Sequence, residues 1–119
     1  MKPELTVDIT KNANSIRRHV PKRAVVTRNE PGVFVQLEVP GHQHTSLGTQ
    51  THLRPNRDFR RGDVALVSDG EADYDDIFVC MADLPTLPRA YALIGSMDED
   101  DVADLALAGI DTAIKIRYR

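Results

Sequence analysis

The chain has 119 residues, of which 41% are hydrophobic and 28% are charged, a mixture that is typical of one folded domain of about 100 to 150 residues and unlike that of disordered chains. Its first residues lack the apolar stretch of a secretory signal, its longest apolar run (77–82) is too short to cross a membrane, and its one cysteine, Cys80, has no internal disulfide partner. We therefore expect a single domain, residues 1–119, that is cytoplasmic or part of a particle assembled in the cytoplasm and that has no membrane partner.

The net charge of −3 conceals an uneven distribution of charge along the chain. Residues 1–62 contain 11 Lys and Arg against 5 Asp and Glu (+6), whereas residues 63–119 contain 4 against 13 (−9). Such asymmetry is typical of proteins that bind nucleic acid or that join an acidic surface of one subunit to a basic surface of another. Alternatively, the two halves interleave in one fold and neutralise each other locally.

The first third of the chain is predicted to form three strands. Residues 4–10 alternate between apolar and polar side chains, as in a strand with one buried face, and a short helical turn capped by Ser15 follows. The β-rich runs 24–28 and 33–39 flank the sequence Glu30-Pro31-Gly32-Val33. This sequence favours a type II turn, because proline presets the second position and glycine accepts positive φ at the third, so the two runs should form a hairpin.

The middle of the chain is predicted to be a loop followed by three further strands. Residues 42–61 are polar and contain turn-forming residues, so we expect a loop with at most a weak hairpin. The run 64–67 and the apolar run around Cys80 should pair as antiparallel strands. Residues 90–94 form another candidate strand, which Gly95 is expected to stop.

One helix is predicted near the end of the chain, at about 97–108. Ser96 and Glu99 have the spacing of a capping box, acidic residues crowd the first turn, where the helix dipole favours carboxylates, and Gly109 is expected to supply a left-handed stop. Residues 112–119 then alternate apolar with mostly cationic side chains, which predicts a closing strand along a sheet edge. About six or seven short strands and one late helix predict an α+β fold that is mostly β, either a small barrel or a curled antiparallel sheet.

Sequence motifs of catalysis are not found in the chain. It contains no glycine-rich phosphate loop, serine nucleophile elbow, zinc-protease pair or kinase motif. Cys80 lies in an apolar run without the cationic neighbours that activate a thiol, and is expected to be a core residue. We therefore expect no catalytic residue, no cofactor and no enzymatic activity.

Two charged clusters are candidate partner-binding surfaces. Arginines around one aromatic ring are typical of sites that bind phosphates and stack on bases, or of surfaces that pair with an acidic partner; here they are Arg54, Arg57, Phe59, Arg60 and Arg61. The candidate acidic partner face consists of Asp69, Glu71, Asp73, Asp75, Asp76, Asp98, Asp100 and Asp101. The acidic run that begins at residue 69 lacks the glycine and the final glutamate of a calcium loop, so a solvated turn or a partner surface is expected there.

Three histidines are candidates for a metal site: His42, His44 and His52. Alternate residues of a strand share a face, and a three-residue turn at 47–49 would set His44 opposite His52. Imidazole is a common ligand of zinc, nickel and iron. Against such a site, no cysteine is nearby, Glu38 is the one close carboxylate upstream, and histidines in polar loops are usually solvated.

From these features we expect a non-enzymatic module for assembly or protein–protein interaction, a homo-oligomer in which the basic half of one copy faces the acidic half of another. Compact modules of this kind are common in phage and mobile-element proteins. An alternative is a small β-domain that binds nucleic acid through the arginines or mimics it through the aspartates. A third hypothesis is a metal-dependent enzyme built on the histidines.

Overall fold

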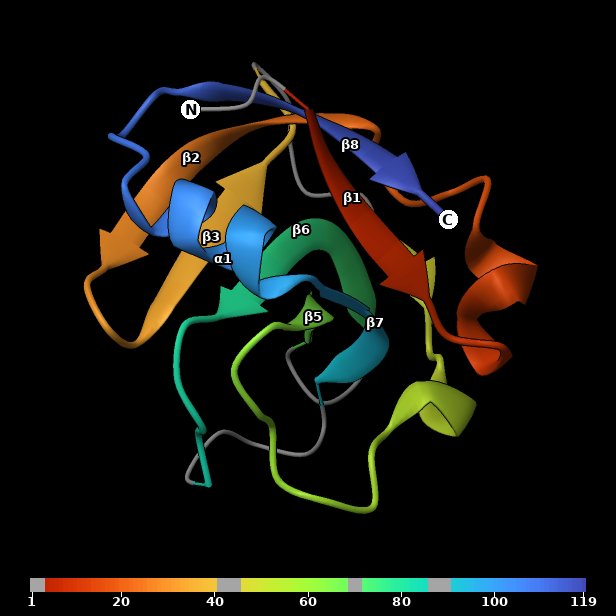
Figure 1. Ribbon diagram of the computed structural model, residues 1–119. Coiled ribbons are helices and arrows are strands. Elements are labelled where there is room, and N and C mark those ends of the chain that lie inside the picture. The colour runs from red at the N-terminus through yellow and green to blue at the C-terminus, as the bar shows by residue number, and fades with distance from the viewer. Residues whose placement is uncertain (1–3, 41–45, 69–71, 86–90) are drawn as a thin grey trace.

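The computed structural model describes residues 4–40, 46–68, 72–85 and 91–119 (Figure 1). The strands are β1 (Glu4–Ile9), β2 (Arg23–Glu30), β3 (Phe34–Glu38), β4 (Ser46–Gly48), β5 (Asp63–Ser68), β6 (Asp73–Cys80), β7 (Ala92–Met97) and β8 (Ala113–Tyr118). The α-helix is α1 (Glu99–Ala106), and two short 3-10 helices are η1 (Asn12–Ile16) and η2 (Thr51–Leu53). No helix in these ranges has the length and apolar character that a bilayer-spanning segment needs.

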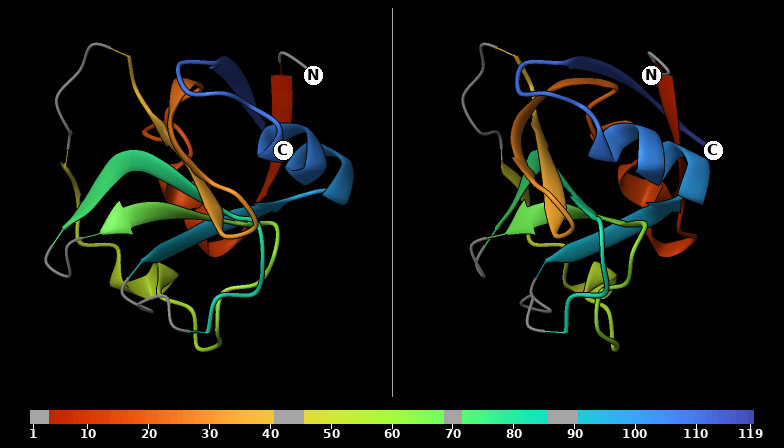
Figure 2. Two further views of the ribbon diagram at one scale, coloured as in Figure 1. Left: turned by 90° about the vertical axis from the view of Figure 1, so that its left-hand side faces the viewer. Right: turned by 60° about the vertical axis from the view of Figure 1, so that its left-hand side comes forward.

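Seven of the strands form a closed barrel, and one further strand is added to it. The order around the barrel is β3-β2-β8-β1-β7-β5-β6, with β6 pairing back to β3, and the short β4 extends the sheet beyond β6. The strands pair antiparallel except β1 and β8, which are parallel. Figure 2 shows α1 at one end of the barrel. The prediction of a mostly-β α+β barrel with one α-helix before the final strand is confirmed.

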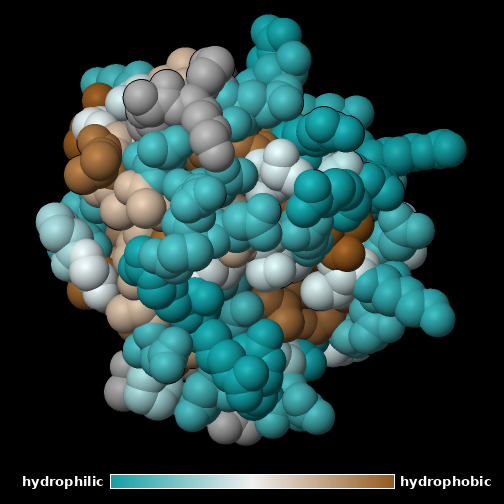
Figure 3. Space-filling model, viewed as in Figure 1, coloured by the Kyte–Doolittle hydropathy of each residue, from teal (hydrophilic) through white to brown (hydrophobic). Residues whose placement is uncertain are grey.

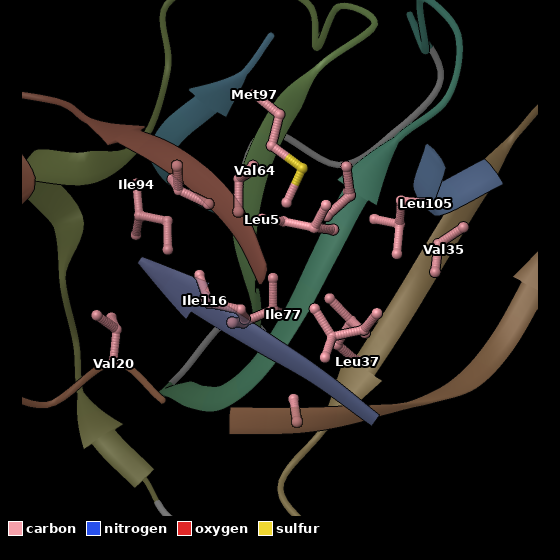
Figure 4. Close-up of a cluster of buried hydrophobic side chains, with 14 of the residues drawn as sticks. Leu5, Val20, Val35, Leu37, Val64, Ile77, Ile94, Met97, Leu105 and Ile116 are labelled. Carbon is pink, nitrogen blue, oxygen red and sulfur yellow. The ribbon is translucent and has the colours of Figure 1, made fainter. Parts of the chain in front are cut away.

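The interior of the barrel is filled by one face of each strand (Figure 4). Leu5 and Val7 of β1 are completely buried, whereas Glu4, the residue before Leu5, points outward and is exposed. Val35 and Leu37 of β3 are likewise completely buried in this main core. Because successive side chains of a strand point to opposite faces, the period-two pattern of the sequence becomes the inner and outer surfaces of the barrel.

The hairpin of β2 and β3 forms as predicted. The amide of Val33 donates a hydrogen bond of 2.9 Å to the carbonyl oxygen of Glu30, and Gly32 has a φ of +74°, as the third position of a type II turn requires. The helical turn before β2 lies at η1, earlier than predicted. Its start is held by Thr10 Oγ1, which accepts a hydrogen bond of 3.2 Å from the amide of Ala13.

The helix α1 lies within the predicted range, but both of its ends differ from the prediction. The capping box does not form, because Ser96 belongs to β7 and Asp98 is the residue that precedes the helix. At the other end, the residue with a positive φ is Asp111 (+70°) and not Gly109. Tertiary packing holds the helix instead, since one face of α1 is completely buried in the main core at Val102 and Leu105.

Contrary to the prediction, Gly95 does not end β7 but lies inside it. A Cβ at this position would be 2.4 Å from the backbone oxygen of Asp8 in β1 and 2.8 Å from Val7 Cγ1. Glycine in the interior of a strand often marks such a close approach of another backbone. Gly95 therefore allows the contact between β1 and β7 that helps to close the barrel.

Contrary to the prediction, the closing strand β8 is not at a sheet edge but lies between β1 and β2. Its residues Lys115 and Arg117 are exposed, whereas Ile114 and Ile116 are buried. In a closed barrel every strand has one face toward solvent, so cationic outward residues do not distinguish an edge strand from one inside the ring.

Candidate functional site

A second apolar cluster lies on the outer side of the barrel. Ala65 of β5, and Phe78 and Cys80 of β6, alternate along their strands with residues of the main core and therefore point away from it. Phe59 joins them from the segment before β5, where its carbonyl accepts a hydrogen bond of 2.9 Å from the amide of Leu84. These four residues are buried, and partly buried side chains pack around them: Phe34, Val67, Leu84, Tyr91 and Leu93.

Cross-strand pairing lines up one residue from each of five strands on this outer side. From β2 through β3, β6 and β5 to β7, the paired residues are Arg28, Gln36, Phe78, Ala65 and Leu93. Of these, Arg28 is exposed, and Gln36 and Leu93 are half-buried. The line therefore begins with a guanidinium and an amide and ends with the apolar side chains of Phe78, Ala65 and Leu93.

Three aromatic rings are in contact beside this line. The rings of Phe34 and Phe78 stack with centroids 4.3 Å apart and an interplanar angle of 24°. Tyr91 meets Phe78 edge to face, at 5.7 Å and 84°, and Arg28 Cζ lies 5.1 Å from the centroid of Phe34. We call Arg28, Phe34, Gln36, Phe78 and Tyr91 the aromatic surface. Because Phe34 and Tyr91 are only half-buried, this surface offers ring area to a ligand next to polar donors.

An ion pair between the half-buried Arg57 and the buried Asp63 lies beside the cluster. Asp63 is 5% exposed and accepts a forked pair of hydrogen bonds from Arg57, of 2.8 and 3.2 Å, and a third of 2.8 Å from the amide of Arg60. Burial, and to a lesser extent the nearby Asp63 carboxylate, raise the pKa of the Cys80 thiol to about 12. Cys80 is therefore a neutral thiol at neutral pH and serves as a core residue, in keeping with its sequence context.

The predicted arginine cluster is divided in the structure. Arg57 and Arg60 line one pocket of about 530 Å³, and Arg54 lines another of about 320 Å³ together with His52. Arg61 pairs with Glu99 at 2.6 Å. The ring of Phe59 is completely buried, so it does not offer a face on which a base stacks. Phosphate or partner binding by these arginines stays a prediction.

The predicted acidic face is also divided. Asp75 and Asp76 are buried in β6, at 8% and 4% exposure, and the side chain of Asp101 accepts a hydrogen bond of 2.9 Å from the amide of Thr6. Asp98 and Asp100 are exposed. For Asp73 the structure gives the backbone, as the first residue of β6, whereas Asp69 and Glu71 lie outside the described residues.

The metal hypothesis is open to only a partial comparison with the structure. His42 and His44 lie outside the described residues, and His52 is exposed in η2. In the part of the chain that is described, no three His, Cys, Asp or Glu side chains are grouped so as to hold a metal ion. The histidine site stays a prediction.

Opposite charges from the two halves of the chain pair with each other in the fold. Ion pairs that cross the division at residue 63 are Arg57–Asp63, Arg61–Glu99, Lys115–Glu4 and Arg119–Asp8. The last of these, at 2.6 Å, lowers the pKa of the Asp8 carboxyl below its ordinary value through the hydrogen bond from Arg119. Hydrophilic side chains dominate the face seen in Figure 3. The halves interleave, which is the alternative that the sequence left open.

The architecture is similar to that of known enzymes. No protein-family model matches the chain, and no curated protein matches it significantly. The crystal structure of a cyclophilin-type peptidyl-prolyl cis-trans isomerase from Cryptosporidium parvum, in the presence of the dipeptide Ala-Pro, matches 88% of this chain and 82% of its own, with a TM-score of 0.62 and 15% identity. A second crystal structure of that isomerase matches 88% of this chain and 81% of its own, with a TM-score of 0.61 and 16% identity.

An uncharacterised Bacillus cereus protein matches 96% of this chain with a TM-score of 0.61 and 14% identity, over 33% of its own length. At these identities the likeness establishes the fold alone, and the fold is that of the cyclophilins. The expectation of a non-enzymatic assembly module is corrected by these matches, because two of the solved structures with this fold are those of a cyclophilin-type isomerase, which is an enzyme. Two ion pairs, Arg57–Asp63 and Arg61–Glu99, join the basic half to the acidic half within the chain, and a homo-oligomer stays a prediction.

No residue of the aromatic surface is among the site residues predicted from the sequence. One signal for it is present in the sequence: β5 and β6 are apolar in consecutive positions, 64–67 and 77–80, and not only in alternate ones. Such a strand is covered on both faces. A second apolar cluster outside the barrel follows from that pattern, although its aromatic partners on β3 and before β7 do not.

Proposed function

We propose that this protein binds proline-containing peptide segments on the aromatic surface and accelerates the cis-trans isomerisation of their Xaa-Pro bonds. The observation that carries the proposal is a pair of half-buried rings, Phe34 and Tyr91, that contact the buried ring of Phe78 beside a guanidinium and an amide, on the outer side of a barrel with the cyclophilin fold. The isomerase from C. parvum, whose structure was determined with Ala-Pro present, supports this choice of ligand.

The rings suit a prolyl group because both partners are flat, rigid and apolar. Aromatic-lined grooves are a recurrent means of binding proline-rich segments, which lose little conformational entropy on binding. Phe34 and Tyr91 flank Phe78, and their half-buried rings leave apolar area that a prolyl ring can contact. Gln36 of β3 is paired with Phe78 of β6, and its side-chain amide is suited to hydrogen bonds with the backbone of a bound peptide.

Catalysis requires that the twisted state of the Xaa-Pro bond be bound more tightly than the planar states. Rotation removes the amide resonance, which accounts for a barrier of about 18–20 kcal/mol, and leaves a lone pair on the prolyl nitrogen. A hydrogen-bond donor at that nitrogen stabilises the twisted state alone. Arg28 is placed for this role: its Nε donates to Glu30 at 2.9 Å, and its Nη groups make no hydrogen bond to any described residue.

The proposal is tested by NMR exchange spectroscopy on a short peptide with one Ala-Pro bond. Without a catalyst the two isomers interconvert over tens to hundreds of seconds, too slowly for exchange peaks, and the protein should produce such peaks at substoichiometric amounts. Arg28→Ala should reduce the exchange rate about 10-fold or more, because a hydrogen bond from a charged group contributes about 1.5–3 kcal/mol. Phe34→Ala should weaken peptide binding.

Arg23→Ala is the matched control, since Arg23 is an exposed arginine of the same strand outside the aromatic surface, and it should leave the rate unchanged. Failure of the wild-type protein to bind the peptide would refute the proposal entirely. Binding without exchange peaks would refute the isomerase activity, and equal losses in the two arginine variants would refute the role of Arg28.

A further inference from the structure

A pocket of about 370 Å³ on another part of the barrel gathers five cationic side chains around one carboxylate. It lies between the connection from η1 to β2 and the outer faces of β8 and β1. Its lining residues are Glu4, Arg17, Arg18, Lys22, Lys115, Ile116, Arg117 and Tyr118. In a protein with a net charge of −3, this pocket has a formal charge of +4 from its five cations and Glu4.

The two walls of the pocket are fixed to each other by hydrogen bonds. The Tyr118 hydroxyl donates to the carbonyl oxygen of Pro21 at 2.6 Å, and the amide of Ile116 donates to the carbonyl oxygen of Lys22 at 2.7 Å. A guanidinium nitrogen of Arg17 donates to the carbonyl oxygen of Tyr118. The cations are therefore presented by a rigid frame of β8 and the preceding connection, and a preorganised site of this kind loses little entropy on binding a ligand.

Most of this positive charge is not neutralised within the protein. Lys115 lies 3.6 Å from Glu4, but in the portion of the chain that the structure describes Arg18, Lys22 and Arg117 have no ion-pair partner. Four arginines outside the pocket are paired with carboxylates: Arg28, Arg57, Arg61 and Arg119. Like charges held together repel each other and destabilise the folded state, and a bound anion would remove that repulsion.

We propose that this pocket binds a small organic ligand that carries two or more phosphate groups. Guanidinium and ammonium groups bind phosphate oxygens strongly, arginine through its planar fork and lysine as a point charge. The volume is within the range of small-molecule sites, roughly 300–1,000 Å³, and the half-buried ring of Tyr118 provides an apolar wall for the organic part. The cations come from two segments, the connection before β2 and the strand β8, and they line one hollow, which favours a compact ligand over a polymer.

The test uses inorganic pyrophosphate as the probe, titrated into the full chain and followed by calorimetry at low salt and by NMR chemical shifts. Binding should weaken as salt increases, with shifts at Lys22, Arg117 and Tyr118. The double variant Arg18→Ala/Arg117→Ala should bind at least about 10-fold more weakly, because charge-assisted hydrogen bonds are lost. Both side chains are exposed, so the fold should be retained, as circular dichroism will verify.

Lys11→Ala, which removes an exposed cation outside the pocket, is the control and should change the affinity less than twofold. The proposal is overturned if pyrophosphate fails to bind at millimolar concentration, or if the control loses as much affinity as the double variant. It is also overturned if a single-stranded oligonucleotide binds far more tightly through the same residues, which would indicate a polymer-binding surface. None of these outcomes depends on isomerase activity.

Discussion

Replacement of Gly95 by alanine tests whether the barrel closes as described. The new methyl group would lie 2.4 Å from the backbone oxygen of Asp8 and 2.8 Å from Val7 Cγ1, whereas carbon–oxygen contacts are normally about 3.3 Å or longer. β1 would have to move by roughly 1 Å from β7, and the obstacle is backbone, which does not rotate away. Overpacking costs about 1–3 kcal/mol, and we expect the upper end of this range.

A loss of about 3 kcal/mol should lower the melting temperature of a domain of this size by roughly 10 °C, measured by circular dichroism. Gly109→Ala is the control: its Cβ would meet nothing closer than Thr112 Oγ1 at 3.9 Å, and no positive φ is found there. That variant should be neutral or more stable by about 0.4–1 kcal/mol, because alanine restricts the unfolded chain. Equal melting temperatures for the two variants would refute the close approach of β1 to β7.

Three further predictions follow from burial and charge. Leu105→Ala should lower the free energy of unfolding by about 2–5 kcal/mol, whereas Leu107→Ala, at an 84% exposed position, should change it by less than about 0.5 kcal/mol. Similar losses of unfolding free energy for the two variants, measured by chemical denaturation, would contradict the placement of α1. Cys80, completely buried and with its pKa raised to about 12, should react with a thiol reagent at pH 8 only as fast as the protein unfolds, so rapid labelling of the folded protein would contradict its burial. The hydrogen bond from Arg119 lowers the Asp8 pKa below its ordinary value of 3.8 in the folded state. The stabilising effect of this pair should therefore be complete above about pH 4 and should disappear as the pH falls through the lowered pKa. An NMR titration that finds an ordinary pKa for Asp8 would contradict the pair.

Local chemistry determined the parts of the fold that the sequence predicts well. The turn at Gly32 follows from proline and glycine in adjacent positions, and it forms with the expected hydrogen bond. Predictions failed where a distant contact decides the outcome. Ser96 has the spacing of a cap, but β7 extends through it because β1 and β5 pair with it there. The cationic face of β8 likewise indicates exposure to solvent without indicating a place inside the ring.

The candidate sites were less predictable because they are assembled from residues far apart in sequence. Phe34 and Phe78 stack only because β3 closes the barrel against β6, a pairing between strands that no sequence periodicity specifies. Counting charge along the chain was misleading for the same reason, since folding brings Arg61 from the basic half to Glu99 in the acidic half. In contrast, the apolar positions on both faces of β6 are readable in the sequence and point toward the outer cluster.

Binding of a proline-containing peptide to the aromatic surface can be tested by chemical-shift mapping. Isotopically labelled protein is titrated with a short peptide that contains Ala-Pro, and the amide signals are followed residue by residue. We expect the largest shifts at Phe34, Gln36, Phe78 and Tyr91, with saturation. Shifts that are absent, that never saturate, or that occur on the opposite side of the barrel would contradict the claim.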